Sequence, residues 1–196
     1  MSSSDPVGEV PPQDWLFHFE TGRLCLDFVA TVGDRAHLAF DRWRTPNDLG
    51  RWCVEAGLLR HPPSFGMADL RAARALREVI YAMIRDVRAK RPLKRSDVER
   101  LNDWSKRPPL APRLHVEGRA VSWQADRPLE AVLAMVGRDA IELLSSPQID
   151  KLRECAGATC SVVFLDLSRP GARRWCSMER CGNRAKKADF RKRHGA

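Results

Sequence analysis

The chain has 196 residues, of which 43% are hydrophobic and 30% are charged. This composition supports a buried core and excludes a disordered tail or a coiled coil. No run of about 18 apolar residues is present, so we expect no membrane-spanning helix and no membrane partner. The early apolar stretch 24–32 contains Asp27, and no small-residue cleavage site follows a basic start. We therefore predict a cytoplasmic protein without a secretory signal.

The net charge of +9 lies almost wholly at the C-terminal end of the chain. Residues 151–196 hold 12 Lys and Arg against 4 Asp and Glu, whereas residues 1–150 hold 22 against 21. This asymmetry predicts a nearly neutral body that carries a basic module, a combination typical of proteins that bind nucleic acid or an anionic surface.

In chain order, the N-terminal part predicts a mobile lead-in followed by helices. Residues 1–14 are rich in Ser and Pro, and we expect structure to begin at Trp15 to Phe19. Apolar residues at helical spacing then predict successive helices: 24–32, 46–56, 67–90, 96–106 and 128–144.

Capping signals support several of these helix boundaries. Thr45 is expected to cap the helix that Pro46 opens. Ser96 and Glu99 have the spacing of a capping box. Ser146-Pro147 predicts a further short helix that leads toward the first cysteine of the basic segment.

Residues 113–124 predict a β-hairpin with its turn at Glu117-Gly118. The predicted fold class is therefore mainly α with a small β-hairpin. We expect a lead-in over 1–14, a helical domain over 15–147 that folds without the remainder, and a separate module over 148–196.

Four cysteines in the basic segment follow the spacing C-x4-C-x15-C-x4-C: Cys155, Cys160, Cys176 and Cys181. Disulfides are rare in the cytosol, so this spacing predicts metal ligands, with two adventitious disulfides or free thiols as the alternative. Four thiolates are a common ligand set for one structural Zn²⁺ per chain, and they leave no open position for catalysis. Cys25 and Cys53 are isolated in apolar surroundings and are not expected to bind metal.

The chain around the cysteine pairs predicts a treble-clef-like finger. Residues 162–165 and 173–175 are expected to form two strands joined by a turn over 168–171, and residues 178–194 a helix that carries the last ligand. So short a segment with few large apolar groups hardly folds alone. Zinc binding, worth roughly 10–16 kcal/mol in finger peptides, would take the place of a core.

The sequence CSMERCGNR at 176–184 resembles the signature of the CGNR zinc finger family, which is named after its last four letters. Phe164-Leu165-Asp166 and the RRW sequence at 173–175 also match the family pattern. The resemblance covers nearly all of residues 151–196 and implies a zinc finger.

The N-terminal part is similar to the ABATE domain that is usually joined to this finger in bacterial proteins. The matching pieces are LCLDFVAT at 24–31, TPNDL at 45–49 and the stretch 52–58, whereas Ala30 stands where the family commonly has Asn. The resemblance implies a stress-induced transcription regulator that binds DNA.

Cations recur along one face of the predicted last helix, and two more precede Trp175: Arg180, Arg184, Lys187 and Arg191, then Arg173 and Arg174. The neighbouring helix face carries Cys181, Ala185 and Ala188, which suits packing beneath the metal. Even after four thiolates on Zn²⁺ are counted, the module keeps a charge of about +6. We predict that it binds duplex DNA mainly through phosphates, with a solvated basic face as the alternative.

Five side chains have a possible functional role, and for three of them a structural alternative is open. Asn183 and Arg184 could pair with base edges, although Asn183 could instead cap backbone groups beside the metal. Trp175 and Phe190 could stack on bases, although Trp175 beside a ligand is also a candidate core residue. Asp27 among apolar residues is either a functional carboxylate or a group that caps a helix or pairs with an Arg.

We therefore predict a regulator without enzymatic activity, in which the helical domain senses a signal or dimerises and the finger binds DNA in association with the nucleoid. A small-molecule ligand in the helical domain and a homodimer are left open. One alternative is a protein-interaction module whose finger docks an acidic partner. Another is an enzyme with its site in the helical domain, although no nucleophile elbow, phosphate loop or HExxH motif is present.

Overall fold

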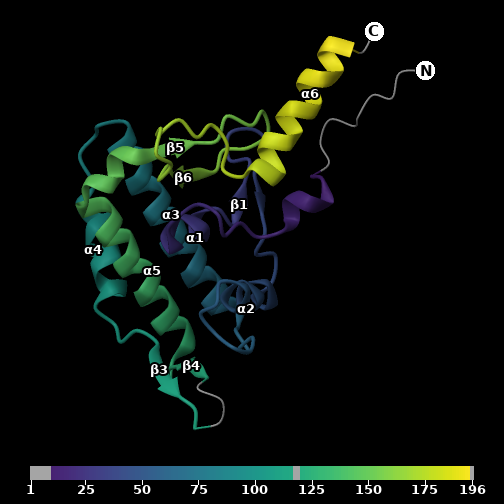
Figure 1. Cartoon of the computed structure of the whole chain (residues 1–196). Helices are drawn as coiled ribbons and strands as arrows, with labels where there is room; N and C mark the ends of the chain where they lie inside the picture. Colours follow the sequence, from purple (N-terminus) through teal and green to yellow (C-terminus); the bar gives the residue numbers. More distant parts are fainter. Residues whose placement is uncertain (1–9, 117–119, 195–196) are drawn as a thin grey trace.

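The computed structural model describes residues 10–116 and 120–194 (Figure 1). These residues form a mainly helical protein with small two-stranded sheets, as predicted. The helices are η1 (Pro12–Trp15), α1 (Leu24–Val29), α2 (Pro46–Glu55), α3 (Met67–Arg88), α4 (Arg95–Ser105), α5 (Pro128–Ser145), η2 (Pro147–Lys151), η3 (Met178–Gly182) and α6 (Asn183–His194). The strands are β1 (Val32–Gly33), β2 (Phe40–Asp41), β3 (Ala111–Leu114), β4 (Val121–Gln124), β5 (Leu152–Glu154) and β6 (Val163–Leu165).

The helices predicted from apolar spacing are present, with differences at their ends. α2 begins at Pro46, where the Asp48 carboxylate accepts the Thr45 N–H at 2.8 Å and closes a capping box. α4 begins at Arg95 without a side-chain cap, so the predicted Ser96 capping box is wrong. The helix predicted over 24–32 ends at Val29 because Val32 pairs with β2.

Structure begins earlier than predicted. Residues 12–15 form the 3-10 turn η1, so the end of the predicted lead-in is ordered; residues 1–9 of that lead-in lie outside the described part of the chain. The hairpin predicted over 113–124 is β3 paired with β4, with Leu114 opposite Val121. Its predicted turn at Glu117-Gly118 falls largely on residues 117–119, outside the described part.

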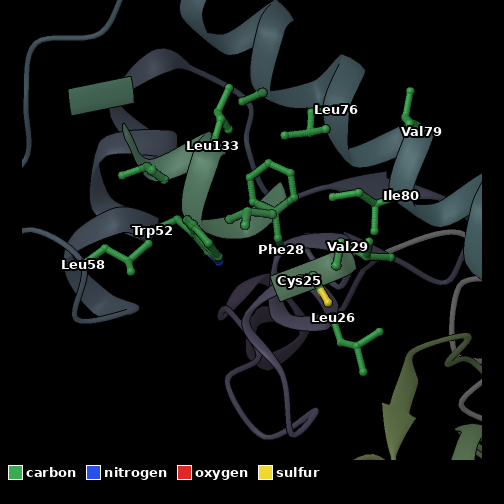
Figure 2. Packing of buried hydrophobic residues seen from close by; sticks show 14 of the residues in the cluster. Cys25, Leu26, Phe28, Val29, Trp52, Leu58, Leu76, Val79, Ile80 and Leu133 are labelled. Carbon is green, nitrogen blue, oxygen red and sulfur yellow. The ribbon is translucent and has the colours of Figure 1, made fainter. Parts of the chain in front are cut away.

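The core lies where α3 and α5 pack on α1, with α4 packed on α3 and α5 (Figure 1). Figure 2 shows Phe28 of α1 between Trp52 of α2 and Leu76 of α3. The ring of Phe28 meets those of Trp43 and Trp52 edge to face, at 5.0 and 5.3 Å between centroids. This geometry adds about 0.5–1.5 kcal/mol per pair beyond the burial of the rings.

The same core continues into the C-terminal segment. Leu152, Val163 and Leu165, from β5 and β6, belong to the main hydrophobic cluster. The Leu165 N–H donates to the Thr21 carbonyl at 2.7 Å. The next residue after Thr21, Gly22, has φ +93°, a conformation that favours glycine. Its backbone lies so close to β6 that a Cβ at this position would be 3.3 Å from the Leu165 Cβ. The β5–β6 sheet is therefore packed directly on the helical part.

Among the described residues, no helix combines the length and the apolar character needed to cross a bilayer.

Candidate metal centre and nucleic-acid interface

The first cysteine pair lies in the turn that connects β5 to β6. β5 pairs antiparallel with β6, with Leu152 opposite Leu165 and Glu154 opposite Val163. The predicted pairing of 162–165 with 173–175 is wrong, because residues 173–175 form no strand and β6 takes its partner from the segment before the first cysteine. The second cysteine pair enters from a loop and from η3, which continues into α6.

This arrangement brings four sulfur atoms together. The Sγ atoms of Cys155, Cys160, Cys176 and Cys181 all lie within 4.8 Å of one another. The Cys160–Cys176 and Cys176–Cys181 sulfur atoms are 3.8 and 3.7 Å apart. A tetrahedral ion with Zn–S bonds of about 2.3 Å requires sulfur atoms about 3.8 Å apart. The cluster therefore has the size of a Cys₄ zinc site.

The backbone around the cluster is also shaped for thiolates. The N–H groups of Gly157 and Cys176 donate to the Cys155 sulfur at 3.4 and 3.3 Å. A Cβ at Gly157 would lie 3.3 Å from the Cys181 sulfur and 3.2 Å from the Cys160 Cβ. A side chain at this position would press on the centre, and donated N–H groups stabilise negative sulfur.

The close sulfur atoms shift one another's pKa values in opposite directions. Hydrogen bonding from Cys160 and Cys176 holds the pKa of Cys155 well below its ordinary value, and the same contact with Cys155 raises the pKa of Cys176. Four such close thiols cannot all ionise by themselves. A divalent cation lowers thiol pKa values and allows all four to act as thiolates.

The predicted DNA-contacting stripe is divided by the fold. Arg180 donates to the Leu16 and Phe17 carbonyls and to His18, at 3.1, 2.7 and 2.9 Å. Arg184 forms an ion pair with Asp14 at 2.6 Å. Arg180 and Arg184 of the predicted stripe thus have partners in the N-terminal segment, and their contact with phosphates stays a prediction.

Arg173 also has partners within the chain. Its guanidinium donates to the carbonyls of Trp175, Cys176 and Glu20 and lies 4.7 Å from the Phe164 ring centroid. Arg173 thus holds the backbone carbonyl of Cys176, a predicted metal ligand, in place. Arg174 is exposed and lies beside the ring of Trp175.

The remaining cations of the stripe lie on α6, which projects away from the rest of the protein (Figure 1). α6 buries no residue, and Lys187 and Arg191 are exposed. Cys181 is buried and Ala185 half-buried, but Ala188 is exposed, so the expected packing of Ala188 beneath the metal is wrong. The helix leaves the metal centre after about one turn.

The remaining candidate side chains differ in burial and in hydrogen bonding. Trp175 packs against the cysteine cluster, as a core residue does. Phe190 is 59% exposed and stacks on His194 at 4.3 Å between ring centroids. Asn183 is exposed, and its side chain forms no hydrogen bond within the described residues, so the expected cap beside the metal is not formed. The Asp27 carboxylate accepts hydrogen bonds from the N–H and the hydroxyl of Thr21, at 3.2 and 2.7 Å. Among the described residues, no Arg forms an ion pair with Asp27.

Sequence reasoning missed the buried polar groups between the finger and the helical part. Arg42 is 3% exposed and donates to the Asp14 and Ala30 carbonyls, both at 2.7 Å. Burial lowers the pKa of Arg42 to about 10. Burial, together with Arg42 and Arg180, lowers the pKa of His18 to about 3, so this imidazole is neutral at physiological pH. No local pattern marks either residue, because their roles arise from contacts distant in sequence.

Taken together, the fold and the site define a mainly helical protein with a four-cysteine cluster of zinc-finger type. The chain belongs to the ABATE family, described as "Putative stress-induced transcription regulator", whose model matches residues 22–147. The CGNR zinc finger model matches residues 151–194. Both matches agree with the resemblance seen in the sequence, and neither description names an enzymatic activity. No curated protein matches the chain.

Proposed function

We propose that the protein is a transcription regulator that binds one structural zinc through Cys155, Cys160, Cys176 and Cys181 and binds duplex DNA through the finger. The carrying observation is α6, a projecting helix without a buried side chain, in which half of the exposed residues are Lys or Arg. Lys187 and Arg191 stand one turn apart, where like charges repel by a few tenths of a kcal/mol. Phosphates relieve this repulsion and release counterions, which favours binding.

The proposed contacts are the cations that the fold leaves exposed. Lys187, Arg191 and Arg174 are the central ones, whereas Arg173, Arg180 and Arg184 chiefly hold the finger on the helical part. Four further expectations stay predictions: the domain boundary between residues 147 and 148, a ligand for the helical domain, a homodimer, and association with the nucleoid. With zinc bound, the four thiolates and the ion together carry a net negative charge. The attraction of the finger for DNA therefore comes from the cations outside the cluster.

Fluorescence anisotropy with labelled duplex DNA over a salt series tests this proposal. Each phosphate contact contributes about 0.9 to the slope of log affinity against log salt. Lys187→Ala should therefore weaken binding to all sequences and lower the slope by about one. Lys94→Ala, an exposed lysine at the start of α4, is the matched control and should change neither quantity.

Two results would contradict the proposal. The first is a zinc-loaded protein that binds no duplex at low salt, where even non-specific attraction is measurable. The second is stronger displacement of the DNA by an acidic polypeptide than by unlabelled duplex, which would favour the protein-interaction module.

A further inference from the structure

A groove runs between α6 and the N-terminal segment of the helical part. One side of the groove is formed by residues 10–15 together with the loop that joins β1 to β2. The other side is formed by α6 together with the turn between Cys155 and Cys160. The volume of this groove, named here the α6 groove, is about 1520 Å³. Pockets for drug-sized ligands measure about 300–1,000 Å³. The α6 groove is therefore large enough for a stretch of polymer.

The wall on α6 is basic. Lys187 and Arg191 line it, both are exposed, and neither has an ion-pair partner in the part of the chain that the structure describes. From Asn183 to Arg191 the helix rises about 12 Å. A stacked nucleic-acid strand rises 3.4 Å per nucleotide, so this wall matches about three to four phosphates.

The opposite wall carries aromatic and apolar side chains beside its polar ones. Trp15 packs edge to face on Phe40, with 5.1 Å between centroids, and both rings line the groove. Leu38 lies beside them and is 45% exposed. A basic wall that follows the backbone, opposite a surface on which bases pack, is the arrangement by which proteins bind single strands.

One polar side chain in the lining of the groove suits the same ligand. Asn183 lines it with an amide that offers both a donor and an acceptor to a base edge. Three carboxylates also line the groove, those of Asp14, Asp34 and Glu179, and the first two have partners. Asp14 pairs with Arg184 at 2.6 Å, and Asp34 accepts from His37 and from the Leu38 N–H at 2.9 and 3.1 Å. Arg184 thus compensates the charge of Asp14 before any phosphate enters, whereas Glu179 is exposed and has no ion-pair partner among the described residues.

We propose that the α6 groove binds an unpaired strand of nucleic acid, with phosphates along Lys187 and Arg191 and bases against Trp15 and Leu38. This inference rests on the proposed nucleic-acid binding by α6, and it adds the N-terminal segment as the second half of the site. A duplex hides the faces of its bases in the stack, so it engages the basic wall alone. An unpaired strand engages both walls and binds more tightly.

The test compares a duplex with the same duplex interrupted by a short single-stranded gap, using the full zinc-loaded chain and fluorescence anisotropy. One base stacked on an aromatic side chain changes affinity about fivefold or more, so the gapped DNA should bind at least that much more tightly. Trp15→Ala should abolish this preference and leave duplex affinity unchanged. Lys187→Ala should weaken both DNAs, and Lys192→Ala, outside the groove lining, should not alter the preference.

Because Trp15→Ala also removes packing on Phe40, a second variant and a second readout accompany it. Leu38→Asp places a charge on the exposed part of the same wall and should also abolish the preference. Gapped DNA should quench tryptophan fluorescence in the parent chain, and Trp15→Phe should remove most of that change. A merely structural role for Trp15 would leave no such DNA-dependent signal.

The outcomes separate this inference from the proposed function. Equal affinity for gapped and uninterrupted duplex, or a preference that survives both Trp15→Ala and Leu38→Asp, would overturn the inference and leave duplex binding intact. Failure of every DNA to bind at low salt would overturn both. Displacement of gapped DNA, but not of duplex, by poly-glutamate would assign the groove to an acidic polypeptide instead.

Discussion

At the scale of single residues, Asp27 links the folding of the helical part to pH. Burial raises the pKa of this carboxyl to about 6, although the two bonds from Thr21 favour its ionised form. The carboxyl in the unfolded chain has a pKa near 3.9. Because the folded pKa is the higher one, the contribution of Asp27 to stability is complete below about pH 4 and is lost as the pH rises through about 6.

Asp27→Asn should therefore stabilise the protein above pH 6, by up to about 3 kcal/mol from a shift of about two pKa units. An Asn oxygen can still accept both bonds from Thr21. Urea unfolding between about pH 3 and pH 8, a range that brackets the two pKa values, measures the effect. The exposed Asp126→Asn is the control. A variant less stable than the parent at pH 8 would show that the carboxylate is needed.

The Arg184–Asp14 ion pair gives a second prediction at this scale. Its side chains are 36% and 15% exposed, so solvent screens the interaction and we expect a coupling energy of about 0.5–1 kcal/mol. A double-mutant cycle with Asp14→Asn and Arg184→Gln, followed by urea unfolding, measures it. The longer Arg51–Asp48 pair, at 3.5 Å, should give less. Additive single-mutant effects at Arg184 and Asp14 would mean that the segment is held by other contacts.

At the scale of elements, the finger depends on its metal more than on its own apolar side chains. Cys176→Ser should abolish most zinc binding and detach η3 and α6 from the rest, because ligation is the main stabilising contribution in so small a module. Elemental analysis and limited proteolysis measure the two effects. Cys53→Ala is the control, since Cys53 lies in the helical core far from the cluster. Full zinc retention in Cys176→Ser would reject this ligand set.

At the scale of the whole molecule, the shared core changes the expectation that residues 15–147 fold alone. A chain that ends at residue 147 loses Leu152, Val163 and Leu165 from the main cluster. Each buried aliphatic side chain contributes about 1.5–3 kcal/mol, and the total is comparable to the whole stability of a typical domain, about 5–15 kcal/mol.

We therefore predict that this truncated chain unfolds at a much lower temperature and with less cooperativity than the full chain, as measured by circular dichroism. A chain that ends at Gly182 loses only α6, which buries no side chain, and should keep nearly full stability. Equal stability of the chain that ends at residue 147 and the full chain would show that the helical part is an independent domain.

The sequence alone determined the features that depend on local spacing. The apolar periodicity of α3 and α5, the cap at the start of α2 and the two cysteine pairs are visible in it, because helix faces, caps and ligand loops involve residues a few positions apart. The resemblance to the two families also rests on such contiguous motifs.

Only the tertiary structure decided which groups meet across the chain. It paired β6 with β5, because an antiparallel partner before the first cysteine closes the ligand turn. It also turned Arg180 and Arg184 toward the N-terminal segment, although helical periodicity alone places them with Lys187 and Arg191. Periodicity states which residues share a face, whereas packing decides what that face meets. The α6 groove, with one wall from each end of the chain, exists for this reason.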